Sequence, residues 1–167
     1  FLQLLQNNGP VKIVVIDNAV VEPESAISEL ANSQSILMSA IMQKKSMVVK
    51  SSLADKDHFF KGIQDAMSTE NSSLCWLLAP RANSHNTPWQ KWPMLNSMAL
   101  NTRAFTHLYY DPKVKSDLLS SSIDLNGDPM MKNAWNELDL ICVDEGEEKN
   151  IPYQFTWADW AYTQYQW

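Results

Sequence analysis

The sequence predicts an α/β fold, a partial parallel sheet flanked by helices, followed by an acidic extension with a β-hairpin and a short helix. Short β-branched runs alternate with helical periodicity over residues 1–111, which is typical of right-handed crossovers in a parallel sheet covered on both faces. Acidic residues outnumber lysines eleven to four over residues 111–167. We place the boundary at Asp111-Pro112, dividing the chain into 1–111 and 112–167, because proline disfavours helix for the residue before it.

The first strand is predicted at residues 11–17. V-K-I-V-V-I-D is nearly continuous in apolar, β-branched character, as in a strand that is buried on both faces. A helix is expected from Pro23 onward, since proline suits a first helical turn and apolar residues recur at helical spacing as far as Ile41. A break in this helix around Asn32-Ser33 is an open alternative.

The same patterns continue along the first segment. Asp55 can cap a helix that carries Phe59, Phe60, Ile63 and Met67 on one face. The elements predicted here are strand 46–53, helix 55–67, strand 73–79, loop 80–90, helix 92–102 and strand 104–110.

The second segment has a different character. Residues 112–135 are predicted to be irregular, and strands 138–143 and 151–155 form a hairpin through the charged connection 144–150. Thr156 to Asp159 has the form of a capping box and opens a terminal helix. We expect the aromatic residues near the end to dock against the α/β body, with a contact surface for another chain as the alternative.

Composition excludes several classes of function. The acidic extension argues against nucleic-acid binding, and no apolar run approaches the roughly 20 residues of a membrane span. Two cysteines 67 positions apart form neither a disulfide framework nor a zinc site, so we expect an intracellular, cytoplasmic location. Because the chain opens with Phe1, we expect it to be cut from a longer polypeptide.

Catalytic motifs are scarce. The sequence lacks G-x-G-x-x-G, H-x-x-x-H, C-x-x-C and G-x-S-x-G. His58 and His107 fall within a predicted helix and a predicted strand, and we expect both to be structural or exposed rather than catalytic. His85 follows the carboxyl end of a strand, where open α/β sheets bind ligands, and it is a candidate site residue.

A cation site is a hypothesis for the turn Asp17-Asn18-Ala19-Val20, which follows the first strand. Asn18 offers a side-chain oxygen and Val20 a backbone oxygen, and Mg²⁺ takes such ligands while holding a diphosphate. An ordinary strand-to-loop turn is the alternative.

In the order of these segments, the chain resembles the thiamine-diphosphate-binding domain of pyruvate:ferredoxin (flavodoxin) oxidoreductases. V-K-I-V-V-I-D-N-A-V is similar to the family's V-L-V-L-D-T-E-V, and S-S-L-C-W-L-L-A-P to P-S-L-I-I-A-Y-A-P. R-A-F-T-H-L-Y-Y-D-P, at residues 103–112, resembles Y-W-P-L-F-R-Y-D-P.

This resemblance implies oxidative decarboxylation of pyruvate or another 2-oxo acid with thiamine diphosphate and Mg²⁺. Electrons would leave through iron–sulfur clusters. It places the metal ligands at Asn18 and Val20, and it adds Asp17 and His85 to the cofactor-binding residues. The cofactor's C2 ylid does the chemistry, while the protein positions the diphosphate.

The chain also departs from the family pattern. The G-D-G motif that opens the family's diphosphate site is absent, and Glu22 and Glu24 stand where the family has neutral polar residues. We therefore expect that this chain alone binds no cofactor and works with the missing N-terminal part of the parent protein or with other subunits, in a homo-oligomer. The alternative is a catalytically degenerate relative that serves as a structural or protein-interaction module.

Overall fold

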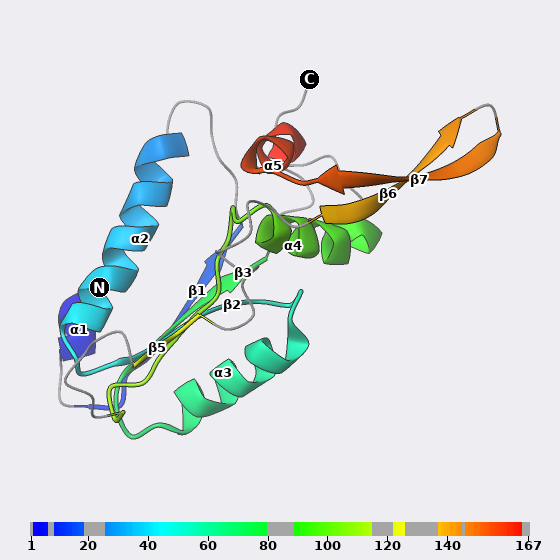
Figure 1. Cartoon of the computed structure of the whole chain (residues 1–167). Coiled ribbons are helices and arrows are strands. Elements are labelled where there is room, and N and C mark those ends of the chain that lie inside the picture. Colours follow the sequence, from blue (N-terminus) through cyan, green and yellow to red (C-terminus); the bar gives the residue numbers. More distant parts are fainter. Residues whose placement is uncertain are drawn as a thin grey trace.

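The computed structural model describes residues 2–6, 9–18, 26–79, 89–114, 122–125, 137–144 and 146–164. A five-stranded sheet lies between helices, and a separate two-stranded hairpin projects beyond it (Figure 1). In chain order the elements are α1 (Leu2–Gln6), β1 (Lys12–Asp17), α2 (Ala26–Met42), β2 (Met47–Ser52), α3 (Lys56–Ser68), β3 (Ser73–Leu78), η2 (Trp89–Lys91), α4 (Trp92–Asn101), β4 (Leu108–Tyr110), β5 (Ile123–Asp124), β6 (Glu137–Asp144), β7 (Glu147–Gln154) and α5 (Trp157–Gln164).

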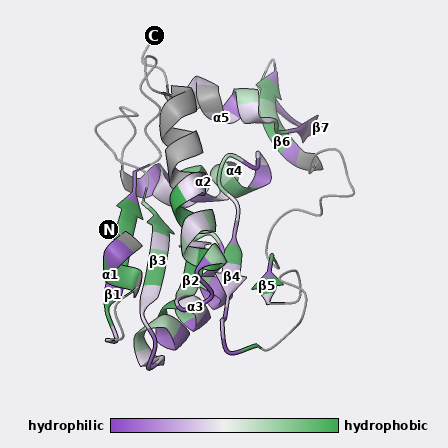
Figure 2. Ribbon diagram, turned by 90° about the vertical axis from the view of Figure 1, so that its left-hand side faces the viewer, coloured by the Kyte–Doolittle hydropathy of each residue, from purple (hydrophilic) through white to green (hydrophobic). Residues whose placement is uncertain are grey.

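Three parallel strands confirm the first part of the prediction. The sheet order is β1-β3-β2-β4-β5, and both β1 and β2 run parallel to β3. Every residue of β2 and β3 is buried, whereas β1 has exposed residues and lies at the edge of the sheet. Figure 2 shows the hydrophobic colouring along these strands.

The prediction of a uniformly parallel sheet is wrong at the fourth strand. β4 is antiparallel to β2, and β5 is antiparallel to β4. A parallel strand needs a crossover that returns the chain to the opposite edge of the sheet. Instead, α4 stays near the carboxyl end of β2, where the Ser52 hydroxyl donates a hydrogen bond to Asn96 Oδ1 at 2.9 Å. The next strand therefore enters from that edge and runs the other way.

Helices α2 and α3 follow the predicted periodicity. α2 runs without a break through Asn32-Ser33, and the predicted start at Pro23 lies outside the described residues. α3 begins as predicted, because Asp55 Oδ1 accepts a hydrogen bond from the backbone N–H of His58 at 3.0 Å.

The sheet carries a hydrophobic core on each face. One core includes Leu74, Trp76 and Leu78 of β3, together with side chains of α2 and α4 and Trp160 of α5. The second lies under α3 and includes Cys75 and Leu77 of β3. The alternation of β3 residues between the two cores agrees with a strand covered on both faces.

The C-terminal hairpin and helix form, but the predicted connection 144–150 is wrong. β7 already begins at Glu147, which pairs with Asp144, because Gly146 adopts a positive φ of 87° that allows a tight turn between the strands. β6 and β7 pair antiparallel, and every residue of β7 is exposed. Trp160 of α5 is buried in the main core, whereas Tyr162 is 68% exposed. None of the described helices is long and apolar enough to cross a membrane.

Candidate functional site

The carboxyl ends of three parallel strands meet along one edge of the sheet, which we call the carboxyl edge. In the strand register, Asp17 of β1 pairs with Leu78 of β3, and Leu78 pairs with Ser52 of β2. The turn Asp17-Asn18 therefore lies at the edge where open α/β sheets bind their ligands.

Asp17 is held against β3 by two hydrogen bonds. Its carboxylate accepts a hydrogen bond from the indole N–H of Trp76 at 2.8 Å, and its backbone oxygen accepts one from the N–H of Ala79 at 2.8 Å. Trp76 is 8% exposed and belongs to the main core. These contacts fix where β1 ends and where the following residue begins.

Asn18 is the next residue and is exposed. Its amide oxygen is a hard donor of the kind that Mg²⁺ accepts. Val20 and His85, the other two candidate residues, lie outside the described residues. Across the described ranges, no group of three or more His, Cys, Asp or Glu is placed to hold a metal ion. Asn18 thus suits one position of a magnesium shell, and the described part of the chain does not complete that shell.

A second polar cluster at the carboxyl edge was not expected as a unit. The imidazole rings of His58 and His107 stack with their centroids 4.4 Å apart and their planes 5° from parallel. Ser51 Oγ lies 2.8 Å from His58 Nδ1. Because 49 positions separate the two histidines, no local pattern in the sequence could have brought them together.

The chemistry of this cluster favours a packing role. A serine hydrogen-bonded to a histidine is the arrangement of a nucleophile and its base, but Ser51 and His107 are both fully buried. Burial lowers the pKa of His58, and burial together with the neighbouring His58 lowers the pKa of His107 to about 4. Both histidines are therefore neutral near pH 7.

Lys50 places a buried cation beside the same edge. Its side chain is on β2, 8% exposed, with Nζ 4.4 Å from the ring centroid of Phe105 and 3.5 Å from Thr106 Oγ1. An ammonium over an aromatic face is stabilised by the ring quadrupole. Lys50 thus helps to hold the segment that leads into β4.

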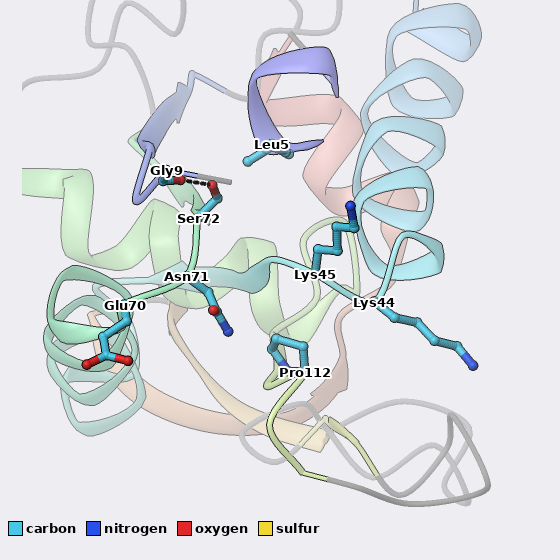
Figure 3. Close-up of a pocket in the computed structure, with 8 residues that line it drawn as sticks. All are labelled: Leu5, Gly9, Lys44, Lys45, Glu70, Asn71, Ser72 and Pro112. Atoms are coloured by element: carbon cyan, nitrogen blue, oxygen red, sulfur yellow. Dashed lines mark hydrogen bonds between the residues drawn. The ribbon is translucent and has the colours of Figure 1, made fainter. Parts of the chain in front are cut away.

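A hollow of about 350 Å³ lies at the opposite edge of the sheet, away from the candidate turn (Figure 3). Its lining residues are Leu5, Gly9, Lys44, Lys45, Glu70, Asn71, Ser72 and Pro112. Figure 3 shows the ammonium groups of Lys44 and Lys45 pointing in different directions. Ser72 donates a hydrogen bond to the backbone oxygen of Gly9 at 2.8 Å. The polar groups of this hollow do not converge on one ligand.

No family model matches the chain, and no curated protein matches it.

Proposed function

We propose that this chain supplies part of a thiamine-diphosphate and magnesium site in a protein that resembles pyruvate:ferredoxin oxidoreductases and oxidatively decarboxylates a 2-oxo acid. The observation that supports the proposal is the position of Asn18. It is exposed, and it follows a parallel strand directly at the carboxyl edge of the sheet.

The roles of the residues follow from their chemistry. Asn18, through its amide oxygen, and Val20, through its backbone oxygen, would hold the magnesium ion. His85, which follows β3 in the sequence, would contact the cofactor. Asp17 acts as a positioning residue, since its bond to Trp76 fixes the end of β1. When bound, thiamine diphosphate would supply the carbanion chemistry of decarboxylation.

The described residues do not complete the proposed site. Magnesium prefers six oxygen ligands in octahedral geometry, and two candidate donors come from the turn after β1. Glu22 and Glu24 follow in the sequence, and carboxylates close to a diphosphate repel it by about 1–4 kcal/mol at 4 Å, depending on screening. The diphosphate and water would supply some of the remaining ligands. A carboxylate ligand would come from another part of the parent protein or from other subunits, and an iron–sulfur protein would take the electrons.

The test measures cofactor content in the native assembly. The assembly is purified through a tag on this chain, and thiamine diphosphate and magnesium are quantified in the wild type and in Asn18→Ala. We expect cofactor in the wild type and its loss in Asn18→Ala. Asn71→Ala, at the opposite edge of the sheet beside the hollow, is the matched control and should retain the cofactor. A wild-type assembly without thiamine diphosphate, or equal content in all three proteins, would refute the proposal.

The second candidate function is a protein-interaction module without cofactor chemistry, and the projecting hairpin favours it. Ile141 and Val143 are 66% and 71% exposed on one hairpin face, and Ile151 and Tyr153 are 45% and 40% exposed on the other. A two-stranded hairpin alone is marginal in water, so apolar residues on both faces suit burial against a partner.

The same purification separates the two candidates. If the hairpin binds a partner, Val143→Lys should release subunits from the assembly, whereas Asn18→Ala should leave its composition unchanged. An assembly that contains no cofactor and loses subunits in Val143→Lys would favour the interaction module.

A further inference from the structure

Among the residues that the structure describes, none shields the outer edge of β1 in the way usual for an edge strand. Within the described residues, β1 pairs with β3 alone. Natural edge strands are commonly shielded by proline, by a bulge or by charges in mid-strand. Here Ile13 to Ile16 is an uninterrupted apolar run, with Val14 47% and Ile16 62% exposed.

The backbone of β1 shows which residues face outward. The N–H of Ser73 donates to the oxygen of Val11, and the N–H of Ala79 donates to the oxygen of Asp17. Odd-numbered residues therefore turn their backbone polar groups toward β3, and Val14 and Ile16 turn theirs away from it. The two residues with exposed apolar side chains thus also present hydrogen-bonding groups at the outer edge.

These side chains lie on the α3 face of the sheet. Lys12 is two residues from Val14, so both side chains lie on the same face of the sheet. Lys12 Nζ donates to the backbone oxygens of Thr69 and Asn71 beside the end of α3. α3 packs mainly on β2 and β3, with Gly62 and Ala66 buried, whereas Val14 and Ile16 on the same face of β1 are exposed.

The exposed flank of α3 extends this apolar strip. Lys61 and Asp65 contact Tyr109 of β4, with Lys61 Nζ 5.3 Å from the ring centroid and Asp65 Oδ2 2.8 Å from the hydroxyl. By helical spacing, Phe60 and Met67 lie on the opposite flank, toward β1. They are 63% and 43% exposed.

We propose that a second copy of this chain covers this edge, its β1 pairing antiparallel with the first across a two-fold axis at Val15. Two identical strands that pair across a two-fold axis run antiparallel. In such a pair, a residue whose backbone N–H and C=O point toward the partner strand must lie opposite another residue of the same kind. With Val15 on the axis, Val14 lies opposite the second copy's Ile16. If Val14 lay on the axis instead, the charged Lys12 would lie opposite Ile16. The register centred on Val15 is therefore favoured, because it places exposed apolar side chains opposite each other.

Charge permits this approach of two copies. Residues 1–114 hold ten Lys and Arg against nine Asp and Glu, whereas the hairpin segment 137–154 holds six acids and one lysine. Figure 2 shows β1 at one side of the sheet and the hairpin toward the other. The acidic hairpin therefore lies away from the proposed contact, and in the Val15 register Lys12 of one β1 lies opposite Asn18 of the other, so that no like charges within the described strands lie opposite each other.

The first test is the mass of the full chain in solution, measured by sedimentation over a range of concentrations. We expect a species of twice the 19.0 kDa chain mass that dissociates on dilution. Ile16→Lys should abolish this dimer. Met42→Lys, on α2 with a matching exposure of 63%, should leave the dimer intact. A monomer at every concentration, or a dimer that Ile16→Lys does not weaken, would overturn the proposal.

The second test fixes the register and does not depend on the folding of Ile16→Lys. In a Cys142→Ser background, Val15→Cys places two cysteines opposite each other at a non-hydrogen-bonded position, where the Cα atoms are about 4.5 Å apart and a disulfide can form. Val14→Cys places its two cysteines on a diagonal at about 7–8 Å. We expect oxidation to cross-link Val15→Cys and not Val14→Cys. The reverse result, or equal cross-linking, would overturn the proposal, and neither test depends on the cofactor.

Discussion

Gly62 lies where α3 packs tightly against β2, and Gly62→Ala tests whether this packing requires a residue without a Cβ atom. A methyl group at position 62 would lie 2.6 Å from Cγ1 of Val49, and both residues are buried. Carbon atoms in contact prefer about 3.5–4.0 Å. Either α3 must move away from β2 or Val49 must leave its rotamer.

Two effects of opposite sign determine how much Gly62→Ala changes the free energy of unfolding. Alanine favours a helix over glycine by about 1 kcal/mol, whereas overpacking a buried contact costs about 1–3 kcal/mol. We expect the overlap to dominate, so that Gly62→Ala lowers the free energy of unfolding by about 1 kcal/mol. In a chain of this length, that corresponds to a fall in Tm of about 2–4 °C.

Urea unfolding of a double-mutant cycle measures the overlap directly. Val49→Ala removes the methyl group that the new Cβ would strike, so its cost should be smaller in the Gly62→Ala background than in the wild type by about 1 kcal/mol. Val48→Ala is the matched control, because Val48 is equally buried but belongs to the core on the other face of the sheet. A more stable Gly62→Ala protein, or equal coupling to both valines, would refute the reasoning.

Two further predictions concern α3 and the histidine pair. The pKa of His107 is about 4, below its usual 6.5, so between these values the unfolded chain binds more protons and the free energy of unfolding falls as the pH falls. His107→Phe, which keeps a ring beside His58, should flatten this dependence in urea titrations at several pH values, and an unchanged slope would contradict the assignment. Asp55→Ala removes the N-cap of α3 and should cost about 1 kcal/mol in unfolding free energy. Asp57→Ala, an exposed change in the first turn, should cost less, and equal losses would argue against the cap.

Local features of the sequence predicted most of the elements. The β-branched runs at β1, β2 and β3 and the periodic apolar residues of α3 arise from side-chain spacing, which repeats within a few residues. The Asp55 cap and the C-terminal hairpin were predicted on the same basis. The position of Asn18 at the carboxyl edge also followed, because parallel strands end at a common edge.

Contacts between distant segments could not be predicted in this way. The direction of β4 depends on where α4 docks, which the bond between Ser52 and Asn96 marks. The bond between Asp17 and Trp76 and the stacking of His58 on His107 join residues 59 and 49 positions apart. None of these pairs has a signature within either of its segments.

The sequence by itself determined the types and order of most elements and the three parallel strands of the sheet, because hydrophobic periodicity and capping act over a few neighbouring residues. Only the tertiary structure decided the reversal at β4, the pairing of β5 within the segment 112–135 that was expected to be irregular, the exposed edge of β1 and the buried histidine pair. These features depend on which surfaces pack together, and the free energy of that packing is shared among segments far apart in the chain.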